Sequence, residues 1–207
     1  MSAKSFADTV TEEFDNIDWD NTPVDAFRDV SFEALANGIE AYILNEDNSI
    51  VECTATGTIT PPTPPSPYTG SAEVEFTFPP ASTLLTLLEA NIGSDTEAGD
   101  ISGLFDSIAQ WLATVVATLT GWSEEDVGTL AGVGTLSFPN MSAQATPAKA
   151  EMQATAPTTR EDAWIIIEKY IILGLTGGVI VVPLPLAVGT VGSAAFTGSA
   201  SGSVNYH

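Results

Sequence analysis

Acidic side chains near the N-terminus are the clearest candidates for metal chemistry in this sequence. Asp15, Asn16, Asp18 and Asp20 supply hard oxygen ligands of the kind that Ca²⁺ requires. An EF-hand loop also needs a glycine at its sixth position, and none follows any starting Asp here. A solvated acidic turn is the better interpretation, so we predict no metal site, and cation binding by the turn at Asp15 to Asp20 stays an open question.

Nucleophilic and redox chemistry has few candidates. The single Cys53 has no partner for a disulfide or a CxxC pair, and the only histidine, His207, is the last residue. Gly198-Ser-Ala-Ser-Gly202 has the glycine spacing of a nucleophile elbow but lies in a tail of small residues without a strand-to-helix turn. General acid and base catalysis would have to use scattered carboxylates. We therefore expect no catalytic residue, no cofactor and no enzymatic activity.

The charge balance excludes another class of function. The 207 residues include 27 Asp and Glu but only 5 Lys and Arg, giving a net charge of −22. No Lys or Arg occurs between Arg28 and Lys149, whereas a nucleic-acid binder needs a basic footprint. We expect no nucleic-acid partner. Because salt screens such self-repulsion, one hypothesis is adaptation to high salt. The alternative is an ordinary acidic protein with a basic partner.

Residues 1–48 are predicted to be a helical segment. Phe6, Val10 and Phe14 recur every four residues, which indicates a short amphipathic helix. Ser31 is the predicted cap of a second helix that carries an apolar stripe from Phe32 to Ile43.

Residues 49–80 are predicted to contain two strands joined by a proline-rich arm. Ile50 to Thr60 is rich in β-branched residues, and Ala72 to Phe78 alternates apolar with acidic or polar residues. Between them, Pro61 to Pro67 favours an extended connection, either an ordered arm or a flexible spacer.

Residues 81–139 are predicted to be mainly helical. A short helix covers Leu84 to Ile92, an acidic loop follows from Ser94 to Asp100, and the longest candidate helix runs from Ile101 to about Leu119. Ser123 with Asp126 predicts one more helical turn, and Gly132 to Phe138 predicts a strand. Residues 140–159 read as an Ala, Thr and Pro linker with little to bury.

Residues 160–207 are predicted to form a helix followed by uncharged, Gly-rich strands. Thr159 is the expected helix cap, Gly177 and Gly178 the expected end, and no charged side chain follows Tyr170 apart from the terminal His207. A weak echo relates the segments that begin at Tyr68 and at Phe196, which predicts two related arms of one sheet. The fold class is therefore α+β, with several short helices and a mainly antiparallel sheet built from the central and C-terminal segments in one domain.

The uncharged stretch from Ile171 to about Ala195 is long enough to cross a bilayer. Glycines and prolines would interrupt a helix there, and no aromatic belt closes its far end. We therefore expect no membrane partner. The stretch is predicted instead to be a helix followed by strands buried on both faces, either inside this fold or against neighbouring copies.

A resemblance rests on the helix that ends in Ala41-Tyr-Ile-Leu-Asn45, the Thr-Gly-Thr strand, the prolines of Pro61 to Pro67 and the Tyr-Thr-Gly-Ser-Ala turn. Over roughly residues 30 to 80 these features resemble small structural proteins of tailed viruses, and the cation-poor acidity is similar to that of virion proteins from viruses of halophilic archaea. The resemblance implies a neck, tail or baseplate component, assembled in the host cytoplasm as a ring with other virion proteins.

The sequence thus predicts a non-enzymatic virion structural protein that forms a symmetric homo-oligomer in high salt. Ile50 to Phe78 and Leu186 to Tyr206 are the expected sheet and assembly elements, with strand addition between subunits as the expected contact. Two alternatives remain open, namely a membrane-associated protein that inserts Ile165 to Val182, and a small ligand-binding module. The position in the particle, the symmetry and the partner chains are not predicted.

Overall fold

The computed structural model describes residues 5–45, 49–61, 64–92, 101–124 and 127–206. The helices in these ranges are α1 (Phe6–Asp15), η1 (Val24–Ala26), α2 (Phe27–Leu44), α3 (Ala81–Ile92), α4 (Ile101–Leu112), η3 (Ser142–Gln144), α5 (Ala145–Thr155) and α6 (Arg160–Leu175). The strands are β1 (Ser49–Thr60), β2 (Ser66–Thr77), β3 (Val116–Trp122), β4 (Leu130–Ser137), β5 (Gly178–Val191) and β6 (Ala194–Tyr206).

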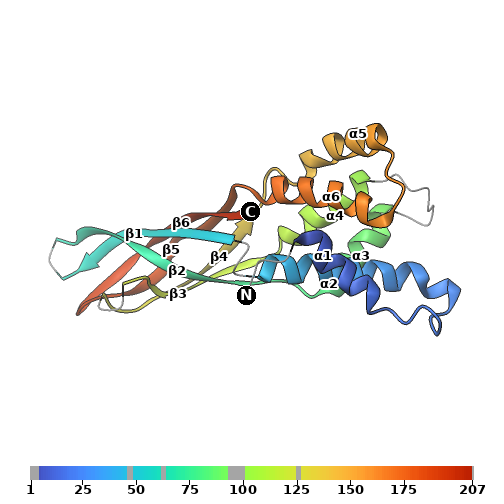
Figure 1. The fold of residues 1–207 in the computed structure, drawn as a ribbon. Coiled ribbons are helices and arrows are strands. Elements are labelled where there is room, and N and C mark those ends of the chain that lie inside the picture. Colours follow the sequence, from blue (N-terminus) through green and yellow to red (C-terminus); the bar gives the residue numbers. More distant parts are fainter. Residues whose placement is uncertain (1–4, 46–48, 62–63, 93–100, 125–126, 207) are drawn as a thin grey trace.

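The six strands form one antiparallel sheet that closes on itself. The strand order is β1-β2-β3-β4-β5-β6, and β6 pairs back onto β1 along the whole of that strand, so the sheet is a closed barrel. Figure 1 shows the barrel projecting from one end of the molecule and the helices gathered at the other. The predicted α+β class, with a sheet from the central and C-terminal segments, is confirmed.

Small residues fill much of the narrow barrel. Cys53, Ala55, Ala72, Ala117 and Ala200 all point inward and are buried. Because the alternation of a strand sends every second side chain inward, these short side chains let opposite walls approach.

Aromatic rings close the end of the barrel that lies far from the helices. Tyr68, Trp122 and Phe196 meet edge to face, with ring centroids 5.1 to 6.2 Å apart. The segments of the weak sequence echo are β2 and β6, which flank β1 on its two sides. Their prediction as two arms of one sheet is confirmed.

The helical end has its own aromatic core. Phe6 of α1 meets Tyr42 of α2 edge to face at 5.6 Å, and Phe14 contacts Trp164 of α6 at 5.9 Å. Ser5 caps α1, because its hydroxyl oxygen accepts from the Asp8 N–H at 3.1 Å. The predicted first helix is thus confirmed, and its apolar face packs against two other helices.

The predicted start of the second helix is wrong. Helix α2 begins at Phe27, four residues before the predicted cap Ser31. The Ser31 hydroxyl donates instead to the Phe27 carbonyl at 2.7 Å, a bond that a serine inside a helix can make.

The prediction of one helix from Ile101 to Leu119 is also wrong. Helix α4 ends at Leu112, and Val116 to Trp122 form β3, so the region 81–139 contains two strands besides its helices. Ala117 and Leu119 point into the barrel, whereas Val116 faces outward. The β-branched run after Ala113 fits a pleated strand better than a helix, and helical spacing alone could not separate the two.

The predicted linker at 140–159 is wrong as well, because it contains η3 and the helix α5. Ala145 and Ala148 are buried, and buried Met141 packs against Gly174 of α6. The segment has few large hydrophobic residues, but its small side chains allow the helices to pack closely. The acidic loop from Ser94 to Asp100 lies outside the described residues, as does Asp126 of the predicted capping box.

The C-terminal predictions are confirmed. Thr159 caps α6 by accepting from the Asp162 N–H at 3.1 Å, and the helix ends at Leu175 before Gly177, whose φ is +75°. The two uncharged strands β5 and β6 follow. The segment Ile165 to Val182, considered for membrane insertion, is divided between α6 and β5.

Candidate assembly surface

The acidic turn after α1 is stabilised by its own hydrogen bonds. One carboxylate oxygen of Asp18 accepts from the Asn21 main-chain N–H at 3.3 Å, and the other accepts from the Asn21 side-chain amide at 2.7 Å. Asp15, Asp18 and Asp20 are exposed. Within the described ranges no group of three or more acidic, His or Cys side chains is placed to hold a metal ion.

A shallow pocket of about 250 Å³ lies beside α1. Its lining comes from α1 and the first turn of α6 and consists of Ala7, Asp8, Thr11, Glu12, Asp15, Asn16 and Glu161. The lining contains carboxylates but no lysine, arginine, histidine or cysteine.

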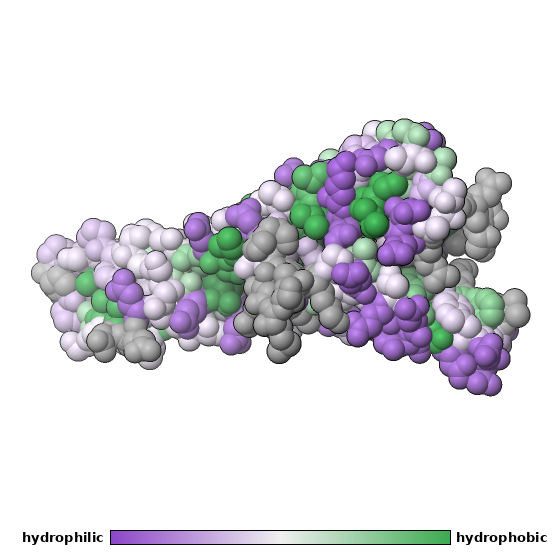
Figure 2. Space-filling model, viewed as in Figure 1, coloured by the Kyte–Doolittle hydropathy of each residue, from purple (hydrophilic) through white to green (hydrophobic). Residues whose placement is uncertain are grey.

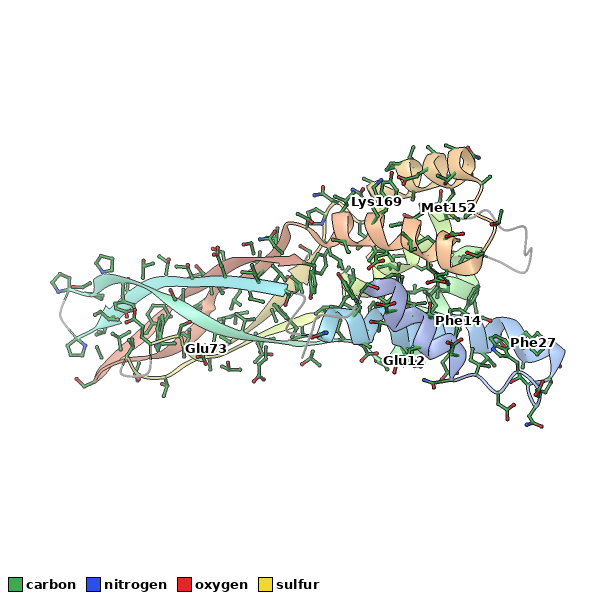
Figure 3. All side chains as sticks on the ribbon, viewed as in Figure 1. Glu12, Phe14, Phe27, Glu73, Met152 and Lys169 are labelled. Atoms are coloured by element: carbon green, nitrogen blue, oxygen red, sulfur yellow. The ribbon has the colours of Figure 1, made fainter. Side chains whose placement is uncertain are left out.

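A second titratable cluster joins α5 to α6. The Glu151 carboxylate accepts from the Lys169 ammonium and from the Tyr170 hydroxyl, each at 2.6 Å. These hydrogen bonds, led by that from Lys169, lower the pKa of Glu151, and the bonds to Glu151 raise the pKa of both Lys169 and Tyr170. The cluster lies on the surface of the helical end, where Figure 3 shows Lys169. It links two helices and faces no pocket that the structure describes.

The remaining candidates of the sequence are strand residues. Cys53 is buried on the inner face of β1, and burial raises the pKa of its thiol. The glycines Gly198 and Gly202 lie inside β6, where a Cβ at either would collide with the main chain of β1. Glycine at these two positions therefore allows β6 to lie close to β1. His207 lies outside the described residues.

The outer face of the barrel is almost free of charge. Its six strands carry only three charged side chains, Glu52, Glu73 and Glu75. Many of the other outward residues are Ser or Thr, such as Thr54, Thr56, Thr58, Thr69, Thr118, Thr135, Thr197 and Ser201. In Figure 2 the strongly hydrophilic residues gather on the helical end, whereas the visible face of the barrel is mostly pale. The high net charge of the chain is thus unevenly distributed.

A group of large hydrophobic side chains is exposed on β5 and its neighbour β4. We call this group the β5 apolar face: Val133, Val179, Val181, Leu184, Leu186 and Val188. Leu184 is 70% exposed. Contiguous apolar surface of this kind marks interaction sites in proteins.

An irregularity in β5 produces the most exposed part of this face. Val182 pairs with Ala200, and the next paired residue of β5, Ala187, pairs with Gly198. Four residues of β5 therefore lie opposite a single residue of β6. Pro183, Leu184, Pro185 and Leu186 therefore leave the ladder and stand out from the barrel wall. The predicted burial of these residues inside the fold is therefore wrong, and their burial against a neighbouring copy stays a prediction. The paired prolines were the available signal, because proline cannot donate to a ladder.

Strand addition between subunits, the assembly contact predicted from the sequence, has little free edge to use on β5 and β6. Strand β6 pairs with β1 and β5, and β5 pairs with β4 and β6. Contacts through β5 and β6 would therefore use side chains.

Comparison with protein-family models, curated proteins and solved structures finds no match to this chain. Among the helices in the described part of the chain, none combines the length and the apolar character needed to cross a membrane.

Proposed function

We propose that this chain is a non-enzymatic structural protein of a tailed-virus particle, in its neck, tail or baseplate, and that it forms a symmetric homo-oligomer adapted to high salt. The observation that carries the proposal is the β5 apolar face, which lies on an uncharged barrel wall of a chain with net charge −22.

Charge restricts which surfaces of two copies can meet. The acidic helical ends repel each other, with a range of about 10 Å at 0.1 M salt and about 3 Å at 1 M. Strands β3 to β6 contain no charged side chain, so their outer face adds no direct charge repulsion to a contact. Burial of Leu184 and Leu186 would supply the hydrophobic gain.

The shape of the molecule suits a ring. Figure 1 shows an elongated barrel to one side of the helices, so copies that meet along β5 would align their barrels and leave the helices at one end. Identical subunits form a closed ring when the rotation repeated at each contact adds up to one full turn. The virion assignment itself rests on the resemblance over roughly residues 30 to 80.

The titratable groups give no support to an enzymatic alternative. The groups whose pKa is raised most, Tyr42 and Tyr206, are buried between the barrel and α2, whereas the Glu151 cluster links α5 to α6. Catalysis would need such groups to converge on one pocket.

The test is the mass of the purified protein by light scattering in about 2 M KCl and in dilute buffer, where screening lengths differ several-fold. We expect a discrete oligomer in high salt. The double variant Leu184→Ser/Leu186→Ser should be a monomer there, because both side chains are exposed in the single chain and their loss removes only the contact.

The matched control is Ile165→Ser/Leu173→Ser, which removes two exposed hydrophobic side chains from α6. This control should keep the oligomer. A wild-type monomer at every salt concentration would contradict assembly, and an oligomer that survives the Leu184 and Leu186 changes would contradict the β5 apolar face. Purification that succeeds only with detergent would favour the membrane alternative.

A further inference from the structure

The ladder between β1 and β2 covers only half of each strand. It runs from Ile59 opposite Ser66 to Thr54 opposite Ser71 and stops there. Residues 49–53 of β1 continue to pair with β6, and residues 72–77 of β2 pair with β3. We call these two facing edges, 49–53 and 72–77, the β1–β2 seam. Figure 1 shows the two strands diverging toward the helices.

Charge repulsion explains where the ladder stops. If the same register continued for two more residues, Glu52 would stand directly opposite Glu73. Like charges at opposite positions of an antiparallel pair are destabilising. The seam therefore leaves two strand edges without a strand partner among the described residues, with main-chain groups able to accept another strand.

The inner side of the seam is apolar and partly open. Val51 points inward like Cys53 and Ala55, yet it is 39% exposed, whereas its β6 partner Val204 is 0% exposed. On β2, the inward side chains of Val74 and Phe76 are only half-buried. Figure 2 shows a hydrophobic area on the barrel near its junction with the helices.

The outer side of the seam is acidic. All three charged side chains of the six strands, Glu52, Glu73 and Glu75, lie on its two edges and face outward. Figure 3 shows Glu73 on the barrel, away from Lys169 at the helical end. The strands contain no lysine or arginine, so these carboxylates have no basic partner on the barrel.

We propose that the β1–β2 seam binds an extended segment of another protein in which apolar residues alternate with lysine or arginine. Its main chain would pair with the free edges, its apolar side chains would contact Val51, Val74 and Phe76, and its basic side chains would meet Glu52 and Glu73. Strand addition of this kind takes affinity from main-chain hydrogen bonds and specificity from alternate side chains.

The donor in this proposal is a different protein. Arg28, Lys149, Arg160 and Lys169 of this chain lie in helices, and no strand of the barrel carries a basic residue. The proposal does not depend on self-assembly through the β5 apolar face, which uses other strands.

The experiment uses a fluorescent ten-residue peptide of alternating lysine and valine, titrated with the full chain at a KCl concentration where the chain is folded. Fluorescence anisotropy should show saturable binding. A peptide with N-methyl groups on alternate residues keeps the charge but cannot form the ladder, and it should bind at least about tenfold more weakly. Equal binding of both peptides would overturn the proposal.

Two variants of equal charge separate the seam from general attraction to an acidic protein. Glu52→Gln/Glu73→Gln should weaken binding about fivefold or more, because it removes the facing carboxylates. Asp20→Asn/Glu124→Gln changes exposed carboxylates elsewhere and should weaken it less than about twofold. Equal losses in the two variants would contradict the seam.

Hydrogen exchange gives an independent readout. Bound peptide should slow exchange of amides within 49–53 and 72–77. Protection confined to other segments would overturn the location.

Discussion

Glu168 of α6 accepts a hydrogen bond from the main-chain N–H of Phe6, the first residue of α1, at 2.7 Å. The two residues are 162 positions apart, so this bond fixes the N-terminal helix to the C-terminal part of the chain. The first N–H groups of a helix have no partner within the helix, and a negative charge at that end is favourable. Glu168 supplies both the acceptor and the charge.

Replacing Glu168 should therefore destabilise the helical end. For Glu168→Ala we expect a loss of about 1–3 kcal/mol in the free energy of unfolding, because the Phe6 N–H loses a charged acceptor. Glu168→Gln keeps an acceptor oxygen and should lose less. Urea unfolding of the three proteins checks the order, and an alanine variant as stable as wild type would show that the bond contributes nothing.

Two tyrosines between α2 and the barrel should make the protein sensitive to alkaline pH. Burial is the larger cause, and the negative charge of Glu168 the smaller, that raise the pKa of Tyr42 to about 12. Burial also raises the pKa of Tyr206, with a smaller contribution from the nearby Tyr42. In the unfolded chain a tyrosine ionises at about pH 10. Above that pH the unfolded chain loses protons that the folded protein retains, so the free energy of unfolding is unaffected below pH 10 and falls as the pH rises toward 12.

The measurement is the urea midpoint from pH 8 to 11.5, with tyrosinate absorbance recorded in parallel. The midpoint should fall above pH 10, and Tyr42→Phe should fall less steeply. Tyr206→Phe also removes a bond of 3.3 Å to the Ile43 carbonyl, so its midpoint should be lower at every pH. A wild-type midpoint that stays constant to pH 11.5 would be inconsistent with the buried, neutral rings.

Local patterns predicted most elements but not the closure of the barrel. Alternation located β2, and Thr159 was recognised as the cap of α6 from its place before an apolar run. The segment from Ala113 to Leu119 was misassigned, because a short apolar run fits helical and strand spacing alike. Whether β6 returns to β1 depends on contacts between residues more than a hundred positions apart, and no local pattern contains that information.

The candidate surfaces were even less accessible from the sequence. The absence of charge after Tyr170 was visible, but it indicated burial on both faces, whereas Leu184 and Leu186 are exposed. The seam depends on the register that places Glu52 against Glu73, and a shift of one residue would reverse the faces of the strand. Register follows from the closed barrel as a whole.

A close approach of β1 and β6 makes Gly57 sensitive to substitution. A Cβ at Gly57 would lie 2.6 Å from the Gly198 Cα and would collide with the Thr197 carbonyl. Since main-chain atoms cannot turn away, Gly57→Ala should cost several kcal/mol, about 2 or more, or prevent folding. At Gly121 the nearest atom is the mobile carboxylate oxygen of Glu73, at 3.3 Å, so Gly121→Ala should change stability by less than about 1 kcal/mol.

Thermal unfolding of both alanine variants gives the comparison. Equal effects at the two glycines would mean that β1 and β6 can separate without loss, contrary to their full-length ladder.

The Trp122 side chain joins two segments by hydrogen bonds at the end of the barrel far from the helices. Its indole N–H lies 3.0 Å from the Thr129 carbonyl and 2.9 Å from the Thr190 carbonyl, and so it bonds the segment before β4 and the end of β5. Trp122→Phe keeps an aromatic ring but removes this donor, and it should cost about 1–3 kcal/mol. Trp19→Phe is the control, because the Trp19 ring lies half-buried in the turn after α1. If both changes cost the same, the indole bond would not hold this end.

Salt should stabilise the protein through its acidic helical end. The barrel strands carry three of the 27 acidic residues, so most of the repulsion arises outside the barrel. Screening shortens the range of this repulsion from about 10 Å to about 3 Å between 0.1 M and 1 M salt, and the largest gain in stability should therefore come below 1 M KCl.

The urea midpoint measured from 0.05 to 2 M KCl checks this expectation. A variant with four exposed helical carboxylates changed to amides, at Asp8, Glu33, Asp106 and Glu161, should show a smaller rise, because less charge remains to be screened. A wild-type midpoint that is unchanged or falls with KCl would contradict salt adaptation, and an equal rise in both proteins would assign the effect to hydrophobic burial in place of charge.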